Sequence, residues 1–283
     1  MILNTKYIFL GTPEFAAIVL EKLISADFIP KAVISNPDKP TGRKQIITPP
    51  PVKALAEKHN LPIYQPKDKN ELFKIVKKLN PDLAVVVAYG MIFPKEVLNI
   101  PKYGFVNVHP SLLPKYRGAA PIQAAILNGE EKTGVSLFLI DEEMDHGSIL
   151  AQKELENYEL RITNYEKLSK KLAELGAKLL IDFLPRLIRN SQSVINNLGV
   201  PQDESKATYT KKIKTEDAFI NLEKDNPIEM ERKIRALNPE PGTWTMKDGK
   251  RIKILGAVLI DEKLKITKIQ VEGGKPQNVC GIV

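Results

Sequence analysis

The stretch DLAVVVAYG, residues 82–90, decides the fold class of this chain. It is a short apolar run, and similar runs occur at 7–11 (YIFLG) and 31–35 (KAVIS). Helix-like stretches alternate with these runs, at residues 15–26, 52–59 and 71–79. This alternation predicts an α/β, Rossmann-like N-terminal domain, with a mostly parallel sheet covered by helices on both faces.

A parallel sheet predicts where a site would lie. The carboxyl ends of parallel strands meet at one edge, and ligands of open α/β sheets bind beyond that edge. The segments AYGMI (88–92) and VNVHPSLLP (106–114) each belong to the end of an apolar run. We therefore expect both segments to emerge at the functional edge.

The second half of the chain adds strands, a long helix and a separate β domain. Runs at 135–140 and 147–156 read as strands, and residues 164–188 read as an amphipathic helix that closes the first domain. A polar segment follows, and then short β-like runs with Asp-Gly turns. The predicted organisation is a domain at 1–189, a linker at 190–205 and a small β-barrel domain at 206–283.

The composition is that of a globular protein with a basic surface. The 283 residues include 42 lysines and arginines against 34 aspartates and glutamates, for a formal charge of +8. This excess favours polyanionic partners such as nucleic acid, although many lysine-rich surfaces bind nothing.

The single cysteine, Cys280, allows no intramolecular disulfide and fits a cytoplasmic location. No run predicts a secretion signal or a membrane span, and we expect a monomer.

The segment FVNVHP contains the first candidate chemistry. Asn107 and His109 are two positions apart, so on a strand their side chains share one face. The later segment LIDEEMDHGSIL supplies Asp141 and Asp145, and a carboxylate from this loop would orient His109 and favour its charged form. Spacing alone leaves open that Asn107 and His109 only cap a strand and that Asp145 is a turn residue.

Several familiar catalytic patterns are missing from the sequence. The first strand-like run continues as LGTPEFAA (10–17), which lacks the G-x-G-x-x-G pattern of a dinucleotide site. No phosphate-binding P-loop and no G-x-S-x-G elbow is present. No His spacing gathers metal ligands, so we predict no catalytic metal.

Four motifs in this order resemble the family of formyltransferases that use 10-formyltetrahydrofolate. They are FLGTPEFA (9–16), VVVAYGMI (85–92), VNVHPSLLPKYRGAAPIQAAILNG (106–129) and DEEMDHGSIL (141–150). Within the family, the chain is most similar to members that formylate methionine esterified to initiator tRNA. The resemblance extends over nearly the whole length, and it implies a catalytic first domain and an OB-like, tRNA-binding C-terminal domain.

The resemblance also implies the roles of particular residues. The family's Asn-His-Asp trio falls on Asn107, His109 and Asp145, with Asn107 and a protonated His109 stabilising the oxyanion and Asp145 holding that charge. The implied folate-binding residues are Ser111, Leu112, Leu113, Pro114, Tyr89, Gly90, Met91, Ile92 and Asp141. The attacking nucleophile is the substrate's own amine, so no covalent enzyme intermediate is expected.

Two basic regions indicate a tRNA acceptor. The Pro-rich loop at 35–53 carries Lys39, Arg43 and Lys44, and by resemblance Arg43 takes the place of a tRNA-reading arginine. The C-terminal candidates are Lys206, Lys211, Lys212 and Lys214. The sequence ends with VEGGKPQNVCGIV (271–283), without the longer basic tail of many members, so we assign no tRNA contact beyond about residue 275.

Three other functions compete with this interpretation. A related formyltransferase could act on a small amine, such as glycinamide ribonucleotide or an amino-sugar nucleotide, and would not need the basic loop. A tRNA-binding module without catalysis would not need the Asn-His-Asp trio. An NAD-dependent dehydrogenase would need the glycine pattern that is missing.

Overall fold

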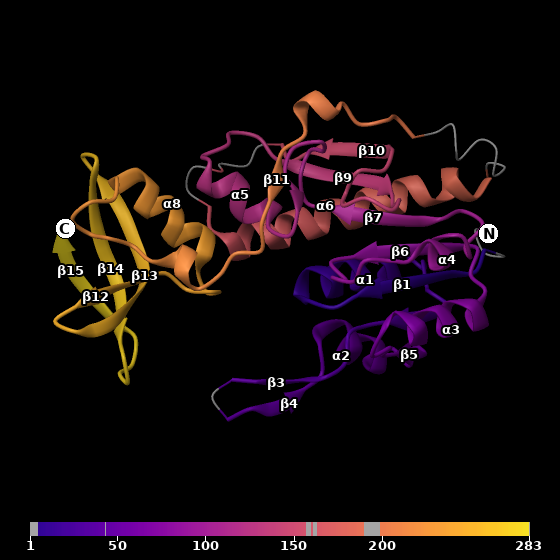
Figure 1. Cartoon of the computed structure of the whole chain (residues 1–283), viewed down its shortest axis with the longest axis horizontal. Helices are drawn as coiled ribbons and strands as arrows, with labels where there is room; N and C mark the ends of the chain where they lie inside the picture. The colour runs from indigo at the N-terminus through magenta and orange to yellow at the C-terminus, as the bar shows by residue number, and fades with distance from the viewer. Residues whose placement is uncertain (1–4, 43, 157–159, 161–162, 190–198, 283) are drawn as a thin grey trace. The chain divides into compact units, whose positions relative to one another are not determined.

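The computed structural model describes residues 5–42, 44–156, 160, 163–189 and 199–282, which form two compact units (Figure 1). Unit 1 comprises residues 1–117, 134–155 and 170–207, and unit 2 comprises residues 118–133, 156–169 and 208–283. Each unit is built from segments that lie apart in the sequence. Among the described residues, no helix is long and apolar enough to span a membrane.

A seven-stranded sheet forms the centre of unit 1, in the order β10-β9-β7-β6-β1-β2-β5. The strands are β1 (Tyr7–Gly11), β2 (Ala32–Ile34), β5 (Ile63–Tyr64), β6 (Leu83–Val87), β7 (Phe105–His109), β9 (Gly134–Leu139) and β10 (Ile149–Glu154). The pairs from β5 to β7 are parallel, whereas β9 and β10 are antiparallel to their neighbours. The mostly parallel α/β sheet predicted from the sequence is thus confirmed.

Helices cover both faces of this sheet. They are α1 (Glu14–Ser25), α2 (Pro51–Lys58), α3 (Lys69–Leu79), α4 (Lys95–Leu98) and α6 (Tyr165–Arg189), of which the last begins in unit 2. On one face, Leu72 and Val76 of α3 join Ile8 and Leu10 of β1 in a buried core. On the other face, α6 approaches so closely at Gly176 that an added Cβ atom would lie 2.6 Å from Val108.

Strand β7 passes between these two helical layers, and its alternation positions the candidate residues. Val106 and Val108 are buried, and Val108 points to the α6 face. Phe105 belongs to the opposite core, together with its partner Ala84 on β6. Since side chains alternate along a strand, Asn107 and His109 share the face of Phe105, as the sequence predicts.

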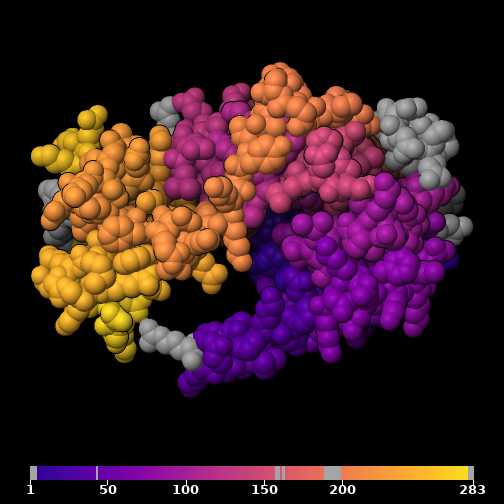
Figure 2. All heavy atoms as spheres, in the orientation of Figure 1, coloured from indigo at the N-terminus to yellow at the C-terminus, as the bar shows by residue number. Residues whose placement is uncertain are grey.

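The basic loop at 35–53 contains an ordered hairpin that the sequence analysis did not predict. Strands β3 (Lys39–Thr41) and β4 (Ile46–Thr48) pair antiparallel, and all six of their residues are exposed. The hairpin extends from unit 1 as a narrow arm, coloured violet in Figure 2. At its base, Lys53 Nζ donates to both carboxylate oxygens of Asp38, at 3.0 and 2.8 Å.

Unit 2 contains the C-terminal β domain. A four-stranded antiparallel sheet consists of β12 (Trp244–Lys247), β13 (Lys250–Ile260), β14 (Lys263–Val271) and β15 (Gln277–Ile282). Helix α8 (Pro227–Leu237) packs Met230 and Ile234 against Ile254 and Leu264 of this sheet. The remaining short elements are distributed over both units. They are β8 (Arg117–Gly118), β11 (Tyr209–Thr210), α5 (Pro121–Leu127), η1 (Glu204–Lys206) and η2 (Glu216–Ala218).

Candidate active site

His109, at the end of β7, is a buried histidine that faces two protein oxygens. Its Nε2 atom lies 2.9 Å from the carbonyl oxygen of Tyr116, and its Nδ1 atom lies 3.6 Å from Oδ2 of Asp145. A carbonyl oxygen can only accept a hydrogen bond, so Nε2 carries a proton. When Nδ1 is also protonated, the ring becomes a cation that faces the Asp145 carboxylate. The structure therefore brings together the histidine and the aspartate predicted from the sequence.

The loop that carries Asp145 approaches His109 from an unexpected direction. Because β9 is antiparallel to β7, its last residues pair with the beginning of β7, and Ile140 donates to the carbonyl oxygen of Phe105. His109 is four residues farther along β7, or about 13 Å at the usual rise of a strand. The loop must therefore turn back along the sheet before Asp145 reaches the imidazole, rather than simply leave the predicted edge.

Asn107 has a buried polar atom that no group in the described part of the chain satisfies. Its Oδ1 atom is inaccessible to solvent and has no hydrogen-bond partner among the described residues. A buried amide oxygen without a partner costs about 1–3 kcal/mol, and such unsatisfied atoms often occur at functional sites. Asn107 and His109 are on the same face of β7, which puts this atom next to the His–Asp pair.

The predicted folate-binding segment 111–114 is an ordered turn beside this pair. The Ser111 hydroxyl donates to the carbonyl oxygen of Lys115 at 2.5 Å, and the Ser136 hydroxyl donates to the carbonyl oxygen of Ser111 at 2.6 Å. Gln152 Nε2 donates to the carbonyl oxygen of Leu113 at 2.7 Å. Ser111 and Leu113 are buried, whereas Leu112 and Pro114 are half-buried. The Ser111 hydroxyl thus shapes the turn, and Leu112 and Pro114 keep accessible surface for a ligand.

The second predicted folate segment, residues 89–92, follows β6. Tyr89 is buried, its hydroxyl has no hydrogen-bond partner among the described residues, and burial raises its pKa to about 12. Gly90 and Ile92 are exposed, and Gly90 has a φ of +78°, which favours glycine. The Asn36 side chain donates to the carbonyl oxygen of Tyr89 at 3.0 Å, so the base of the basic loop touches this turn.

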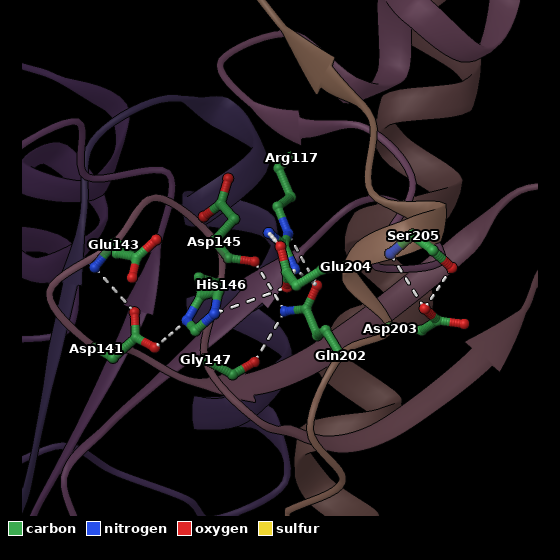
Figure 3. A network of polar contacts seen from close by, with 10 residues as sticks. All are labelled: Arg117, Asp141, Glu143, Asp145, His146, Gly147, Gln202, Asp203, Glu204 and Ser205. Atoms are coloured by element: carbon green, nitrogen blue, oxygen red, sulfur yellow. Dashed lines mark hydrogen bonds and ion pairs between the residues drawn. The ribbon is translucent and has the colours of Figure 1, made fainter.

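Asp141 is engaged within its own loop and does not face His109. Its carboxylate accepts from the backbone N–H of Glu143 at 3.0 Å and lies 2.6 Å from Nδ1 of His146 (Figure 3). This hydrogen bond is the main reason that the pKa of His146 is raised. The His146 side chain is 36% exposed and paired with Asp141. Asp145, not Asp141, is therefore the carboxylate that approaches His109.

Sequence reasoning missed a polar cluster that adjoins the candidate site. Arg117 is completely buried, and its guanidinium binds Gln202 and Glu204 (Figure 3). Its hydrogen bonds hold the pKa of Glu204 below the usual range. Gln202 Nε2 donates to the carbonyl oxygen of Asp145. Arg117 lies within the motif YRGAAP, but Gln202 and Glu204 fall in the predicted linker, where nothing marked them as site residues.

The basic residues predicted to bind tRNA are on the surface where they are described. Lys39, Lys44, Lys211, Lys212 and Lys214 are exposed. Lys206 is also exposed, although its Nζ atom lies 2.9 Å from Asp203. Arg43 lies outside the described residues. No cluster of three or more potential His, Cys, Asp or Glu metal ligands occurs in the described part of the chain.

Curated proteins of one kind match this chain over most of its length. A methionyl-tRNA formyltransferase of Caldicellulosiruptor saccharolyticus is 48% identical over 253 residues, covering 87% of this chain and 78% of that protein. Another, from Kosmotoga olearia, is 45% identical over 258 residues, covering 90% of this chain and 80% of that protein.

Solved structures show the same fold at much lower identity. HypX from Aquifex aeolicus, solved in complex with tetrahydrofolic acid, superposes with a TM-score of 0.67 at 16% identity, covering 98% of this chain and 46% of that chain. A sugar N-formyltransferase from Shewanella sp FDAARGOS_354 gives a TM-score of 0.65 at 19% identity, covering 92% of this chain and 100% of that chain.

Family comparisons account for both parts of the protein. The formyl transferase family matches residues 5–184, and the formyl transferase C-terminal domain matches residues 212–268. With these matches and relatives above 40% identity, the chain belongs to the formyl transferase family.

Proposed function

We propose that this protein transfers a formyl group from 10-formyltetrahydrofolate to the α-amine of methionine esterified to initiator tRNA, for translation initiation. The observation that carries this proposal is the approach of Asp145 to His109, at 3.6 Å, beside the orphaned amide oxygen of Asn107. The names of the curated relatives support the tRNA acceptor. A substrate of translation also supports a cytoplasmic location.

The reaction needs stabilisation of a tetrahedral oxyanion. The substrate amine attacks the formyl carbon, the C–N bond to the folate breaks, and one proton must leave the amine while another reaches the departing nitrogen. We assign the Asn107 Nδ2 group as a donor to the oxyanion. Both nitrogens of His109 face protein oxygens, so His109 contributes mainly through its positive charge.

Asp145 has two roles in this mechanism. Its carboxylate balances the His109 cation at 3.6 Å, and its partial exposure lets it receive the proton that leaves the amine. The group that protonates the departing folate nitrogen is not assigned. The expected folate contacts are the accessible surfaces of Leu112 and Pro114 and the turn at 89–92, with Ser111 and Leu113 supporting them.

Two separate regions would hold the tRNA. The β3–β4 hairpin presents Lys39, and Ile46 and Ile47 are more than 60% exposed. In the sequence, Arg43 and Lys44 fall between Thr41 and Ile46. Cationic side chains on an extended arm suit the phosphates and groove edges of an acceptor stem. The second region would consist of Lys206, Lys211, Lys212 and Lys214.

We propose that the chain is organised as a catalytic domain at 1–189, a linker at 190–205 and a tRNA-binding domain at 206–283.

The test is formylation of charged initiator tRNA with 10-formyltetrahydrofolate as donor. Parallel reactions contain glycinamide ribonucleotide or an amino-sugar nucleotide as the only acceptor. We expect rapid formylation of the tRNA and none of the small amines. Formylation of a small amine but not of the tRNA would assign the chain to another branch of the family.

A further inference from the structure

Gln202 uses all of its hydrogen-bonding groups to connect the buried Arg117 to the loop at residues 141–147, which carries Asp145 and is called the catalytic loop below. Its Nε2 atom donates to the carbonyl oxygens of Asp145 and Gly147, both at 2.8 Å. Its Oε1 atom accepts from Nε and Nη2 of Arg117, at 3.0 and 2.8 Å. A primary amide has two N–H donors and an oxygen with two lone pairs, so these four bonds fix its orientation completely.

Arg117 determines which way this amide points. Its guanidinium is completely buried, and it also donates to both carboxylate oxygens of Glu204, at 2.9 and 2.6 Å (Figure 3). A buried cation requires a paired anion, and a fork-shaped guanidinium holds a carboxylate in one geometry. The remaining edge of Arg117 faces Oε1 of Gln202 and therefore turns the NH2 group of Gln202 toward the catalytic loop.

The catalytic loop needs this external support. Asp145 has a φ of +50°, a conformation that costs free energy for a residue with a side chain. At Gly147, an added Cβ atom would lie 1.7 Å from the carbonyl oxygen of Leu139, so the loop passes directly over the end of β9. The segment that presents Gln202 is itself anchored, because Val200 and Ile149 exchange two backbone hydrogen bonds of 2.9 Å.

We propose that Gln202 is a positioning residue that holds the backbone of Asp145 so that its carboxylate faces His109. Arg117 and Glu204 orient the Gln202 amide, and none of the three touches the reacting atoms. The proposal rests on the catalytic role given to Asp145 above. It also implies that two residues of the predicted linker, Gln202 and Glu204, contribute to catalysis.

The substitution Gln202→Glu removes the two N–H donors of this amide and keeps its acceptors. Glutamate keeps oxygen acceptors for Arg117 and nearly the same shape, but it replaces the NH2 group with an oxygen that repels the two loop carbonyls. We expect kcat for tRNA formylation to fall about 10- to 100-fold, because small displacements of a catalytic group have effects of this size. The KM values for folate and tRNA should stay within about twofold of the parent. Gln202→Met, which also lacks the donor, should lower kcat without adding a charge.

A double-mutant cycle separates positioning from general damage. If Gln202 acts through Asp145, Gln202→Glu should lower kcat by less than about threefold when Asp145→Asn is already present. A merely structural role would give the same loss in both backgrounds. Asp203→Asn is the matched control, since Asp203 is exposed, adjacent to Gln202 and bonded to Ser205 and Lys206 outside this cluster. Thermal unfolding establishes that each variant is folded.

The outcomes discriminate between the two proposals. If the parent is active, two results would overturn the positioning role of Gln202. One is an equal loss of kcat from Gln202→Glu in the parent and in Asp145→Asn. The other is a loss of kcat in Gln202→Glu but not in Gln202→Met. A parent that does not formylate charged initiator tRNA would instead overturn the proposed function. The cycle can then be measured with whichever small amine is formylated.

Discussion

The Nδ1 atom of His109 lies 3.6 Å from a carboxylate oxygen of Asp145, while Nε2 of the same ring lies 2.9 Å from the carbonyl oxygen of Tyr116. Both oxygens attract N–H groups, and only the doubly protonated ring can satisfy both. A fixed positive charge at that place would stabilise an oxyanion formed beside Asn107.

Removal of either proposed oxyanion-stabilising group should reduce turnover. We expect His109→Ala and Asn107→Ala each to lower kcat about 100- to 1000-fold, because the charge that they stabilise develops in the transition state. Tetrahydrofolate affinity, measured by calorimetry, should change little. Turnover of both variants within tenfold of the parent would refute these assignments.

Loss of the Asp145 charge should alter the dependence of activity on pH. Asp145→Asn retains the shape of the side chain but removes the carboxylate that faces His109 and that would receive the amine proton, so kcat should be lower and its dependence on pH should change. The measurement is kcat over a range of pH for parent and variant. An unchanged profile would remove Asp145 from the mechanism, and Asp203→Asn provides the control for loss of a carboxylate that does not contact His109.

The β3–β4 hairpin should matter for tRNA and not for folate. Arg43→Ala should lower kcat/KM for charged initiator tRNA about tenfold or more, since one good polar contact to nucleic acid is worth roughly 1–3 kcal/mol. Tetrahydrofolate affinity should remain that of the parent.

Salt dependence gives a second measurement on the same loop. A variant without the charges of Lys39, Arg43 and Lys44 should bind tRNA with a shallower dependence on salt, because fewer counterions are released. Equal slopes, combined with normal tRNA formylation by Arg43→Ala, would show that the hairpin does not contact the acceptor.

The His146–Asp141 pair should make stability depend on pH. The hydrogen bond to Asp141 raises the pKa of His146, so its stabilisation is complete below the unfolded value, about 6.5, and is lost as the pH rises through the folded value. His146→Gln should remove this contribution. The measurement is the change in Tm between pH 6 and pH 9, which we expect to be smaller in the variant; an identical change in both proteins would contradict the effect.

A methyl group at Gly134 should disturb the proposed folate segment. Its Cβ atom would lie 2.2 Å from the carbonyl oxygen of Lys153 and 2.6 Å from Cδ2 of Leu112. We expect Gly134→Ala to cost roughly 1–3 kcal/mol in stability and to weaken tetrahydrofolate binding as Leu112 moves. Gly256→Ala, whose Cβ atom would meet Thr267 at 3.0 Å in unit 2, is the control and should leave folate affinity unchanged.

Local patterns in the sequence were sufficient for the α/β architecture. Apolar runs such as 82–90 predict strand β6, and the amphipathic pattern at 164–188 closely matches α6. The spacing of Asn107 and His109 also predicts a shared face, because strand side chains alternate with a period of two. These features depend on neighbouring residues along the chain, so a sequence contains them directly.

Contacts between distant segments required the tertiary structure. The sequence offered both Asp141 and Asp145 as partners of His109, and only the return of the loop along the antiparallel β9–β7 pair selected Asp145. Likewise, burial of Arg117 against Gln202 depends on how the chain after α6 returns to the sheet. Burial and pairing of charged groups follow from the packing of the whole unit, whereas strand alternation is set by the local backbone.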